Sequence, residues 1–192
     1  MAGTLTAPMN APSPLFAGPV DHDRYPDDYI RAVLNAVSTI AVVGASANTV
    51  RPSYFVQKYL LSKGYRVFPI NPGQAGKEIL GQPVHASLAA VPEPIDMVDI
   101  FRASEAVPGI VDEVLALSPL PKVVWMQLGI RNDEAAHRLE EAGIAVVMNR
   151  CPKIEYARLC GEISWTGVNS RTISAKRPTR MGGVQHLGLK RD

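Results

Sequence analysis

The chain has 192 residues, of which 46% are apolar and 20% are charged, a composition typical of an ordinary globular protein. A chain of this length buries one sizeable core, so we expect a single folded domain. No apolar run approaches the roughly 20 residues of a membrane-spanning helix, so we expect no membrane association. The N-terminus lacks the features of a secretory signal, and Cys151 and Cys160 are too few for a disulfide framework. These features favour a reducing, cytoplasmic location.

The net charge of +2 is unevenly distributed along the chain. Residues 171–192 carry a net charge of +5, which leaves −3 on residues 1–170. Charge confined to a Gly-containing, weakly apolar end is more typical of a solvated tail than of a nucleic-acid-binding arm. We therefore interpret residues 171–192 as a basic flexible tail and expect no nucleic-acid partner.

The N-terminal 24 residues contain four prolines and show neither helical nor strand periodicity. We expect residues 1–24 to be disordered and to lie outside the fold. Apolar residues recur at helical spacing from Tyr29 to Val37, which predicts a short amphipathic helix that ends near Ser38.

Strand and helix patterns alternate in the rest of the chain. Thr39 to Val43 is a β-branched, continuously apolar run that Gly44 stops, which is typical of a strand buried on both faces. Four further long strands are predicted, at residues 65–70, 95–101, 122–126 and 144–148. Helices are predicted at residues 52–64, 104–117 and 132–142, with Ser104 and Asn132 as N-caps. Residues 81–85 predict a short strand, and residues 88–91 a single turn of helix. The alternation predicts a doubly wound, mostly parallel, Rossmann-like α/β domain over residues 25–170.

The first junction between strand and helix, Gly44 to Ser53, is the predicted ligand site. In such a sheet the ligand lies beyond the carboxyl ends of the strands, where free N–H groups meet an anion. Gly44 permits a close backbone approach, Ser46 offers a hydroxyl group and Asn48 an amide, while the Arg51 guanidinium suits phosphate. The alternative is a plain tight turn with a surface arginine.

This junction lacks the dinucleotide fingerprint Gly-x-Gly-x-x-Gly, because Ser46 stands where the second glycine would be. The second strand also ends in Ile70-Asn71-Pro72, without the acidic residue that binds ribose hydroxyls in NAD-dependent enzymes. Both departures disfavour hydride transfer with NAD.

Six segments resemble, in one order, the small stand-alone CoA-binding proteins and the N-terminal CoA-binding domain of the succinyl-CoA synthetase α-subunit. The resemblance covers about residues 25–176. The segments are Val42-Val43-Gly44-Ala45-Ser46, Arg51-Pro52-Ser53, Pro69-Ile70-Asn71-Pro72, Ile79-Leu80-Gly81, Asp99-Ile100-Phe101-Arg102 and Asn149-Arg150-Cys151.

The resemblance implies that coenzyme A or an acyl-CoA binds with its phosphates on the loop from Gly44 to Arg51. Its adenine end would lie near Asn71 and Pro72, and Phe101 and Arg102 would line the middle of the site. The chain departs from the synthetase pattern at Gln74, where that pattern has a lysine, and Lys77 is a possible substitute. The synthetase's phosphohistidine lies in a second domain that this chain is too short to contain, so the resemblance implies no ligase reaction by this chain alone.

No catalytic or metal-binding constellation emerges from the sequence. The four histidines show no nucleophile-and-base or metal-ligand spacing, and Asp96 and Asp99 would point to opposite faces of a strand. Cys151 follows the last strand and is either a thiol activated by a helix N-terminus and nearby cations, or a small packing residue. Gln127 either binds ligand at the mouth of the site or satisfies backbone groups in a turn.

Three functions remain open from the sequence. The first is non-catalytic binding of coenzyme A or acyl-CoA, as a carrier, sensor or regulatory partner. The second is an enzyme, either an NAD(P)-linked oxidoreductase or one component of a multi-chain acyl-CoA ligase. The third is an interaction protein with a vestigial pocket.

Overall fold

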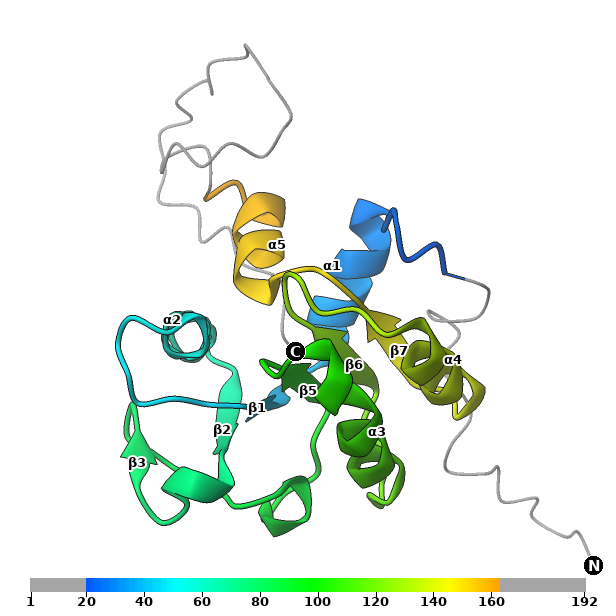
Figure 1. Cartoon of the computed structure of the whole chain (residues 1–192). Helices are drawn as coiled ribbons and strands as arrows, with labels where there is room; N and C mark the ends of the chain where they lie inside the picture. The colour runs from blue at the N-terminus through cyan, green and yellow to red at the C-terminus, as the bar shows by residue number, and fades with distance from the viewer. Residues whose placement is uncertain (1–19, 163–192) are drawn as a thin grey trace, which may run out of the picture.

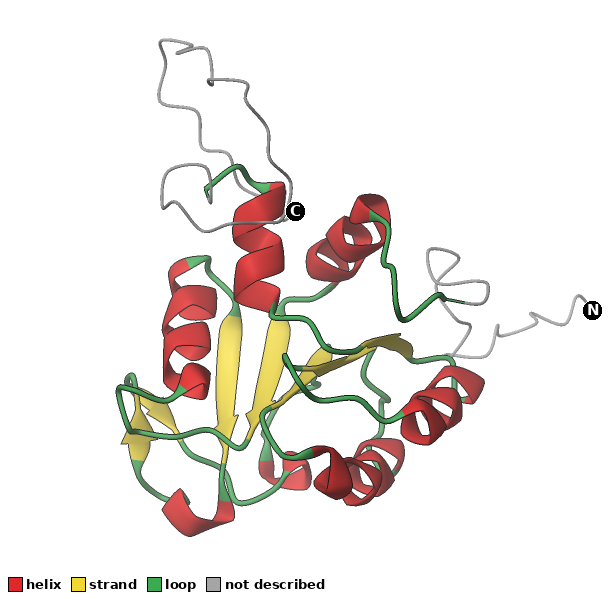
Figure 2. Cartoon of the chain, turned by 45° about the horizontal axis from the view of Figure 1, so that its top comes forward, coloured by secondary structure: helices red, strands yellow, loops and turns green. Residues whose placement is uncertain are grey.

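The computed structural model describes residues 20–162, which form a parallel sheet covered by helices on both faces (Figures 1 and 2). Five strands pair in the order β2-β1-β5-β6-β7. They are β1 (Thr39–Val43), β2 (Arg66–Ile70), β5 (Met97–Ile100), β6 (Val123–Met126) and β7 (Ala145–Val147). All four pairings are parallel. The predicted doubly wound, Rossmann-like fold is confirmed.

Two apolar layers enclose the sheet. The layer on one face joins it to α1 (Asp27–Ala36), α2 (Pro52–Ser62) and α5 (Pro152–Leu159). The other layer joins it to α3 (Val107–Leu115) and α4 (Asp133–Glu141). Successive strand residues enter opposite layers, because side chains alternate across a pleated strand.

Two predicted elements differ in the structure. The expected short strand at residues 81–85 does not join the main sheet as a full strand, because β4 (Gln82–Pro83) pairs with β3 (Glu78–Ile79) in a separate antiparallel hairpin. The helix predicted from Ser104 begins as a 3-10 turn at Ser104–Ala106, and α3 starts at Val107. Pro108 explains this start, since proline favours the first helical turn, and Ser104 accepts a hydrogen bond from Arg131 N–H instead of capping α3.

The strand order changes direction at β1, because the chain moves outward to β2 and then returns to pair β5 on the other side of β1. The loops after β1 and β5 start side by side at the carboxyl edge of the sheet and lead to α2 and α3 on its opposite faces. This switch point is where parallel sheets of this kind bind ligands. None of the helices in residues 20–162 is long and apolar enough to span a membrane.

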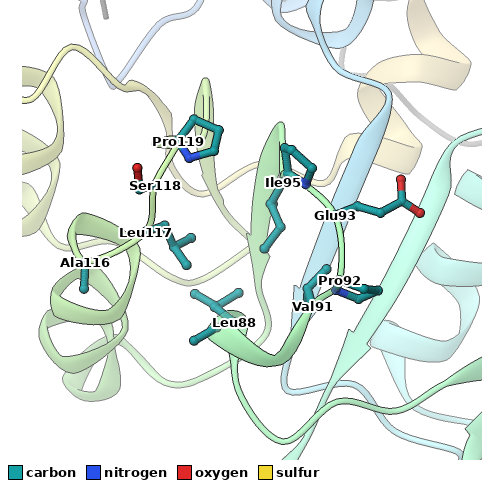
Figure 3. Close-up of a pocket in the computed structure, with 11 residues that line it drawn as sticks. Leu88, Val91, Pro92, Glu93, Ile95, Ala116, Leu117, Ser118 and Pro119 are labelled. Atoms are coloured by element: carbon teal, nitrogen blue, oxygen red, sulfur yellow. The ribbon is translucent and has the colours of Figure 1, made fainter. Parts of the chain in front are cut away.

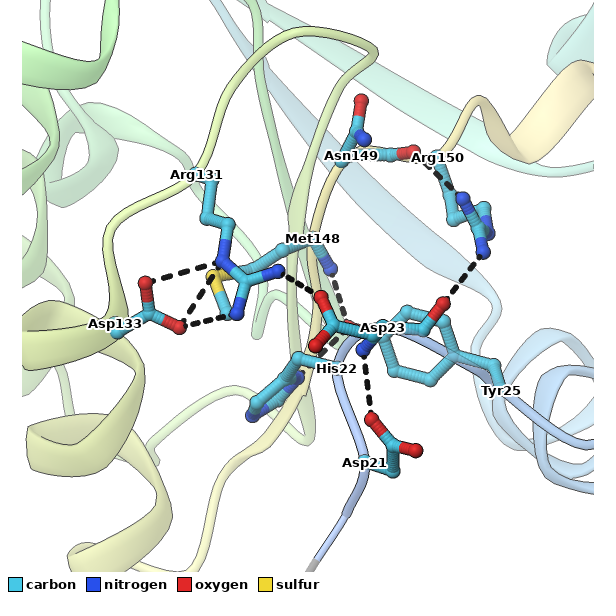
Figure 4. Close-up of polar contacts among 9 residues, drawn as sticks. All are labelled: Asp21, His22, Asp23, Tyr25, Arg131, Asp133, Met148, Asn149 and Arg150. Atoms are coloured by element: carbon cyan, nitrogen blue, oxygen red, sulfur yellow. Dashed lines mark hydrogen bonds and ion pairs between the residues drawn. The ribbon is translucent and has the colours of Figure 1, made fainter.

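Residues 20–24, which we expected to lie outside the fold, contact the domain. Figure 4 shows Asp23 paired with Arg131 in the loop before α4, and His22 beside Tyr25. The Tyr25 hydroxyl group accepts a hydrogen bond from the buried Met148 N–H at 2.8 Å. Burial raises the pKa of Tyr25 to about 12, so the phenol stays protonated at neutral pH. The expectations for residues 1–19 and for the basic tail lie outside the described residues.

We expect Tyr25→Phe to lower the free energy of unfolding by about 1–3 kcal/mol, because it leaves the Met148 N–H buried without a partner. Urea denaturation measures this loss. Tyr54→Phe is the matched control, since the Tyr54 hydroxyl has no hydrogen-bond partner among the described residues, and this variant should retain wild-type stability. Equal stability of wild type and Tyr25→Phe would show that the hydroxyl does not anchor the N-terminal segment.

Candidate ligand site at the carboxyl edge of the sheet

A cavity of about 610 Å³ lies at the carboxyl edge of the sheet, beside the switch point. It is bounded by the loop after β1, the start of α2, the ends of β5 and β6, and the start of α5. Most of the predicted site residues line it, namely Gly44, Ala45, Ser46, Arg51, Asn71, Phe101, Arg102, Gln127 and Cys151. The structure thus brings residues from five separate parts of the chain to one opening.

Gly44 is the residue that allows the loops after β1 and β5 to meet. Its φ of +89° is a backbone conformation that is unfavourable for residues with a Cβ. A Cβ at this position would lie 3.0 Å from the Phe101 carbonyl oxygen and 3.0 Å from Arg102 Cδ. Glycine is therefore required here both for its backbone conformation and for the close approach of the two loops.

The loop after Gly44 presents free backbone donors to the cavity. The N–H groups of Ser46 and Ala47 have no hydrogen-bond partner within residues 20–162. In the first turn of α2 the Ser53 N–H adds to them, since it too has no partner within residues 20–162. Pro52 has no N–H, and the N–H groups of Tyr54 and Phe55 bond to the Arg51 carbonyl group. Ser53, in this first turn, is 3% exposed and lines the cavity. Together these groups form an anion-binding surface.

Two guanidinium groups lie at this opening without a carboxylate partner. Arg51 precedes α2, Arg102 follows β5, and neither forms an ion pair in the part of the chain that the structure describes. Most other described arginines are paired, as Arg131 is with Asp23 and Asp133. Two arginines without carboxylate partners, beside free N–H groups, suit a ligand with more than one phosphate group.

The Asn71 side chain is hydrogen-bonded to the protein's own backbone. Its Nδ2 donates to the Ala45 carbonyl group at 2.7 Å, and its Oδ1 accepts a hydrogen bond from Gly73 N–H at 2.9 Å. The Asn71 side chain therefore ties the end of β2 to the loop after β1. It also lines the cavity, but its amide group already holds the protein's own backbone.

Asp99 and Gln127 form a buried pair at the inner end of the cavity, which the sequence analysis did not find. Asp99 is fully buried, and Gln127 Nε2 donates to its two carboxylate oxygens at 2.9 and 3.1 Å. Burial raises the pKa of Asp99 to about 8, although the hydrogen bond from Gln127 opposes this shift. The sequence placed both residues at strand ends, but residues 28 positions apart cannot be paired without the strand order.

Cys151 is a buried N-cap residue of α5, with a side chain that lines the cavity. Burial raises the pKa of the Cys151 thiol, and hydrogen bonds from the backbone of Ile154 and Lys153 only partly oppose this shift. The expected activation by a helix N-terminus is therefore outweighed by desolvation. The structure favours the packing alternative over a reactive thiol.

Not every predicted contact reaches the cavity. Asn48 and Pro72 are absent from its lining, and Asn48 instead accepts a hydrogen bond from Val50 N–H within the loop. Lys77 lies in the turn before β3, and it is not a lining residue either. Five further lining residues, mostly apolar or small, were not among the individually predicted contacts: Pro52, Ser53, Val56, Leu128 and Ile130. Pro52 and Ser53 lie within the predicted junction, whereas nothing in the sequence pointed to Val56, Leu128 and Ile130.

A second cavity, of about 370 Å³, lies at the opposite edge of the sheet (Figure 3). Its walls are the segments before β5 and before β6, with Leu88, Ile95 and Leu117 pointing inward. Glu93 is the charged residue in its lining, and it pairs with Arg66. This cavity therefore offers no unpaired cation to an anionic ligand.

Comparison with known proteins assigns the chain to a family. The family model of the CoA binding domain matches residues 38–157. The chain belongs to the CoA binding domain family. The matched range contains both the loop after β1 and the N-terminus of α5.

Relatives of this chain include proteins that the match covers almost completely. The uncharacterised Bacillus subtilis (strain 168) protein YneT is 38% identical over 128 residues, which cover 67% of this chain and 92% of YneT. The solved structure of cell-free ID.343 from Thermus thermophilus is 44% identical with a TM-score of 0.66, and the match covers 70% of this chain and 99% of that one.

A larger enzyme contains a similar domain. A dinucleotide-forming acetyl-coenzyme A synthetase from Ca. Korarchaeum cryptofilum is 26% identical with a TM-score of 0.53. The match covers 60% of this chain but 26% of the synthetase. These findings confirm the resemblance to CoA-binding domains of the synthetase type.

We expect Gly44→Ala to lower the free energy of unfolding by about 2 kcal/mol, because the variant combines a left-handed backbone with a collision against the Phe101 carbonyl group. Gly109→Ala in α3 is the matched control. A Cβ there meets nothing within 4 Å, so this variant should gain up to about 1 kcal/mol. Denaturation with urea measures both, and an equal response of the two glycines would contradict the argument.

Because the pKa of Asp99 is raised in the fold, we expect the free energy of unfolding to fall as the pH rises. Between its unfolded pKa of 3.8 and its folded pKa of about 8, the folded state holds a proton that the unfolded state releases. The free energy of unfolding should therefore decrease by up to about 1.4 kcal/mol per pH unit across this window. Asp99→Asn should remove this contribution, as measured by urea denaturation at several pH values.

Asp96→Asn provides the opposite control for this prediction. Lys122 and the N–H groups of Ser38 and Thr39 bind the Asp96 carboxylate and hold its pKa below the usual value, despite partial burial. The stability from Asp96 is thus present above its unfolded pKa and is lost as the pH falls. If Asp99→Asn left the pH slope unchanged, Asp99 would not be the buried acid that sets it.

Proposed function

We propose that this chain binds coenzyme A or an acyl-CoA in the cavity at the carboxyl edge of the sheet, without catalysing a reaction on it alone. The observation that carries the proposal is the coincidence of free loop N–H groups with the unpaired Arg51 and Arg102, in a domain of the CoA binding family. Coenzyme A supplies a diphosphate and a 3′-phosphate to such a surface.

The direction in which the ligand lies follows from the different chemistry at the two ends of the cavity. The phosphates lie at the loop after β1 and at the start of α2, and the adenine end lies toward β2, near Asn71 and Pro72. The pantetheine arm then extends across the ends of β5 and β6 toward Gln127 and Cys151. The mostly apolar or neutral residues at this inner end, such as Leu128 and Ile130, suit an uncharged arm better than a phosphate.

The chemistry of the lining supports binding rather than catalysis. The cavity contains no histidine, and its one thiol has a raised pKa. Its lining also holds no carboxylate at the end of β2 for the ribose hydroxyls of NAD. A role as carrier, sensor or regulatory partner fits a domain that holds its ligand and leaves it unchanged.

A second candidate function is one component of a multi-chain acyl-CoA ligase. The match to 26% of the Korarchaeum acetyl-coenzyme A synthetase favours it, because there a similar domain is part of a larger enzyme. Acyl-CoA formation from acid, ATP and CoA would then require a second chain. Product formation by the purified chain alone would contradict both candidates.

We expect Arg51→Ala to weaken the binding of CoA by about 1.5–3 kcal/mol, roughly 10- to 150-fold in Kd, because it removes a charge-assisted contact to phosphate. Adenosine 3′,5′-bisphosphate should lose affinity as well, since it retains the phosphates near this loop. Isothermal titration calorimetry measures both. Arg66→Ala, at the opposite edge of the sheet, is the matched control and should bind like wild type. Equal CoA affinity of wild type and Arg51→Ala would remove Arg51 from the site.

A further inference from the structure

Asp99 is an acid that the proposed phosphate site does not use. It lies on β5, fully buried, and its pKa reflects burial and the hydrogen bond from Gln127 rather than any neighbouring cation. A buried carboxyl group without a cation opposes folding at neutral pH. Its position therefore calls for an explanation beyond stability, and its partner Gln127 supplies one.

The orientation of the Gln127 amide follows from this pairing. Both contacts to Asp99 come from Nε2, so Oε1 points away from the carboxylate. Gln127 is 5% exposed and lines the cavity. Its Oε1 accepts no hydrogen bond from any residue in 20–162, and it is not sealed from solvent as His85 Nε2 is. With Asp99 ionised, the inner end of the cavity thus presents one oriented hydrogen-bond acceptor.

Resting on the proposed function, we propose that Gln127 is a specificity-determining residue for the pantetheine arm. In the complex, its Oε1 accepts a hydrogen bond from an amide N–H group of that arm, and the Asp99 carboxylate is the positioning residue that holds the amide in this orientation. An arm of coenzyme A that crosses the ends of β5 and β6 brings its two amide groups past this acceptor. A nucleotide without such an arm leaves the acceptor unused.

A proton on Asp99 couples to this contact. A carboxylate accepts both hydrogen bonds from Nε2, whereas a protonated carboxyl group has an O–H that is best donated to Gln127 Oε1. The free protein at neutral pH holds that proton, because the pKa of Asp99 is raised to about 8. A ligand N–H that occupies Oε1 therefore favours the carboxylate, and binding releases a proton from Asp99.

The other titratable and charged groups at this end differ from Asp99 in position. Cys151 faces it from the start of α5, and burial together with the Asp99 charge raises the pKa of that thiol. Arg51 and Arg102 lie at the mouth, just before α2 and just after β5. If the proton released on binding comes from Asp99 and not from one of these groups, the release must be lost when Asp99 is replaced.

The affinity test compares two probes on the full chain, CoA and adenosine 3′,5′-bisphosphate. Gln127→Leu should weaken CoA about 5- to 10-fold, the effect of one neutral hydrogen bond, and should leave the bisphosphate within twofold of wild type. Arg51→Ala is the contrasting control, because it should weaken both probes. Unchanged CoA affinity in Gln127→Leu, or equal losses for the two probes, would overturn the proposal.

The double variant Asp99→Leu/Gln127→Leu covers the risk that Gln127→Leu destabilises the domain by leaving Asp99 without a partner. Since Asp99 acts through Gln127, the double variant should bind CoA no more weakly than Gln127→Leu alone. An additional loss from Asp99→Leu in the double variant would show that Asp99 acts on the ligand independently and would overturn its positioning role.

Proton release gives a readout that a purely structural role would not change. Calorimetric titration of CoA at pH 7.5, in buffers with different ionisation enthalpies, counts the protons released on binding. Wild type should release more protons than Asp99→Asn, and the difference should vanish for the bisphosphate. Equal release by both proteins would overturn the coupling. If neither CoA nor the bisphosphate bound to wild type, the proposed function itself would fail, which is a separate outcome.

Discussion

The close approach between Gly44 and the Phe101 carbonyl group is the constraint on which the site depends. β1 and β5 are hydrogen-bonded neighbours at the switch point, and the loops that leave them lead to helices on opposite faces of the sheet. Gly44 N–H bonds the end of β2, while Phe101 N–H bonds the end of β1, so neither backbone is free to move away. Only a residue without a Cβ fits between them, and its position directs the following N–H groups toward the cavity.

The loop after β1 is held by side-chain hydrogen bonds that leave two of its backbone N–H groups free. Asn71 binds the Ala45 carbonyl group from β2, and the side chains of Ser46 and Asn48 accept hydrogen bonds from N–H groups within the loop. These contacts fix the backbone without using the donors of Ser46 and Ala47. A loop ordered in this way binds an anion at a smaller entropic cost than a loop that must first become ordered.

Much of the fold was predictable from the sequence because it depends on local patterns. The run from Thr39 to Val43 is apolar throughout, and a strand buried on both faces requires such a run. The side-chain pair of Asp99 and Gln127 was not predictable, because it joins two strands whose adjacency depends on the strand order. The same limit applied to residues 20–24, where composition suggested disorder but His22 and Asp23 find partners on α4 and in the loop before it. The sequence did not decide whether Cys151 is a reactive thiol or a packing residue, because the answer depends on its burial in the fold.

Asp96 and Asp99, three residues apart at opposite ends of β5, show that the two edges of the sheet have different roles. Asp96, at the amino edge before β5, accepts two backbone N–H groups and pairs with Lys122, so its charge stabilises the fold. Asp99, three residues later at the carboxyl edge, has neither a backbone donor nor a cation, and its charge opposes folding. An acid retained at such a cost is expected at a functional site, where local rules of stability are broken. The amino edge is built for stability, and the carboxyl edge keeps its polar groups available to a ligand.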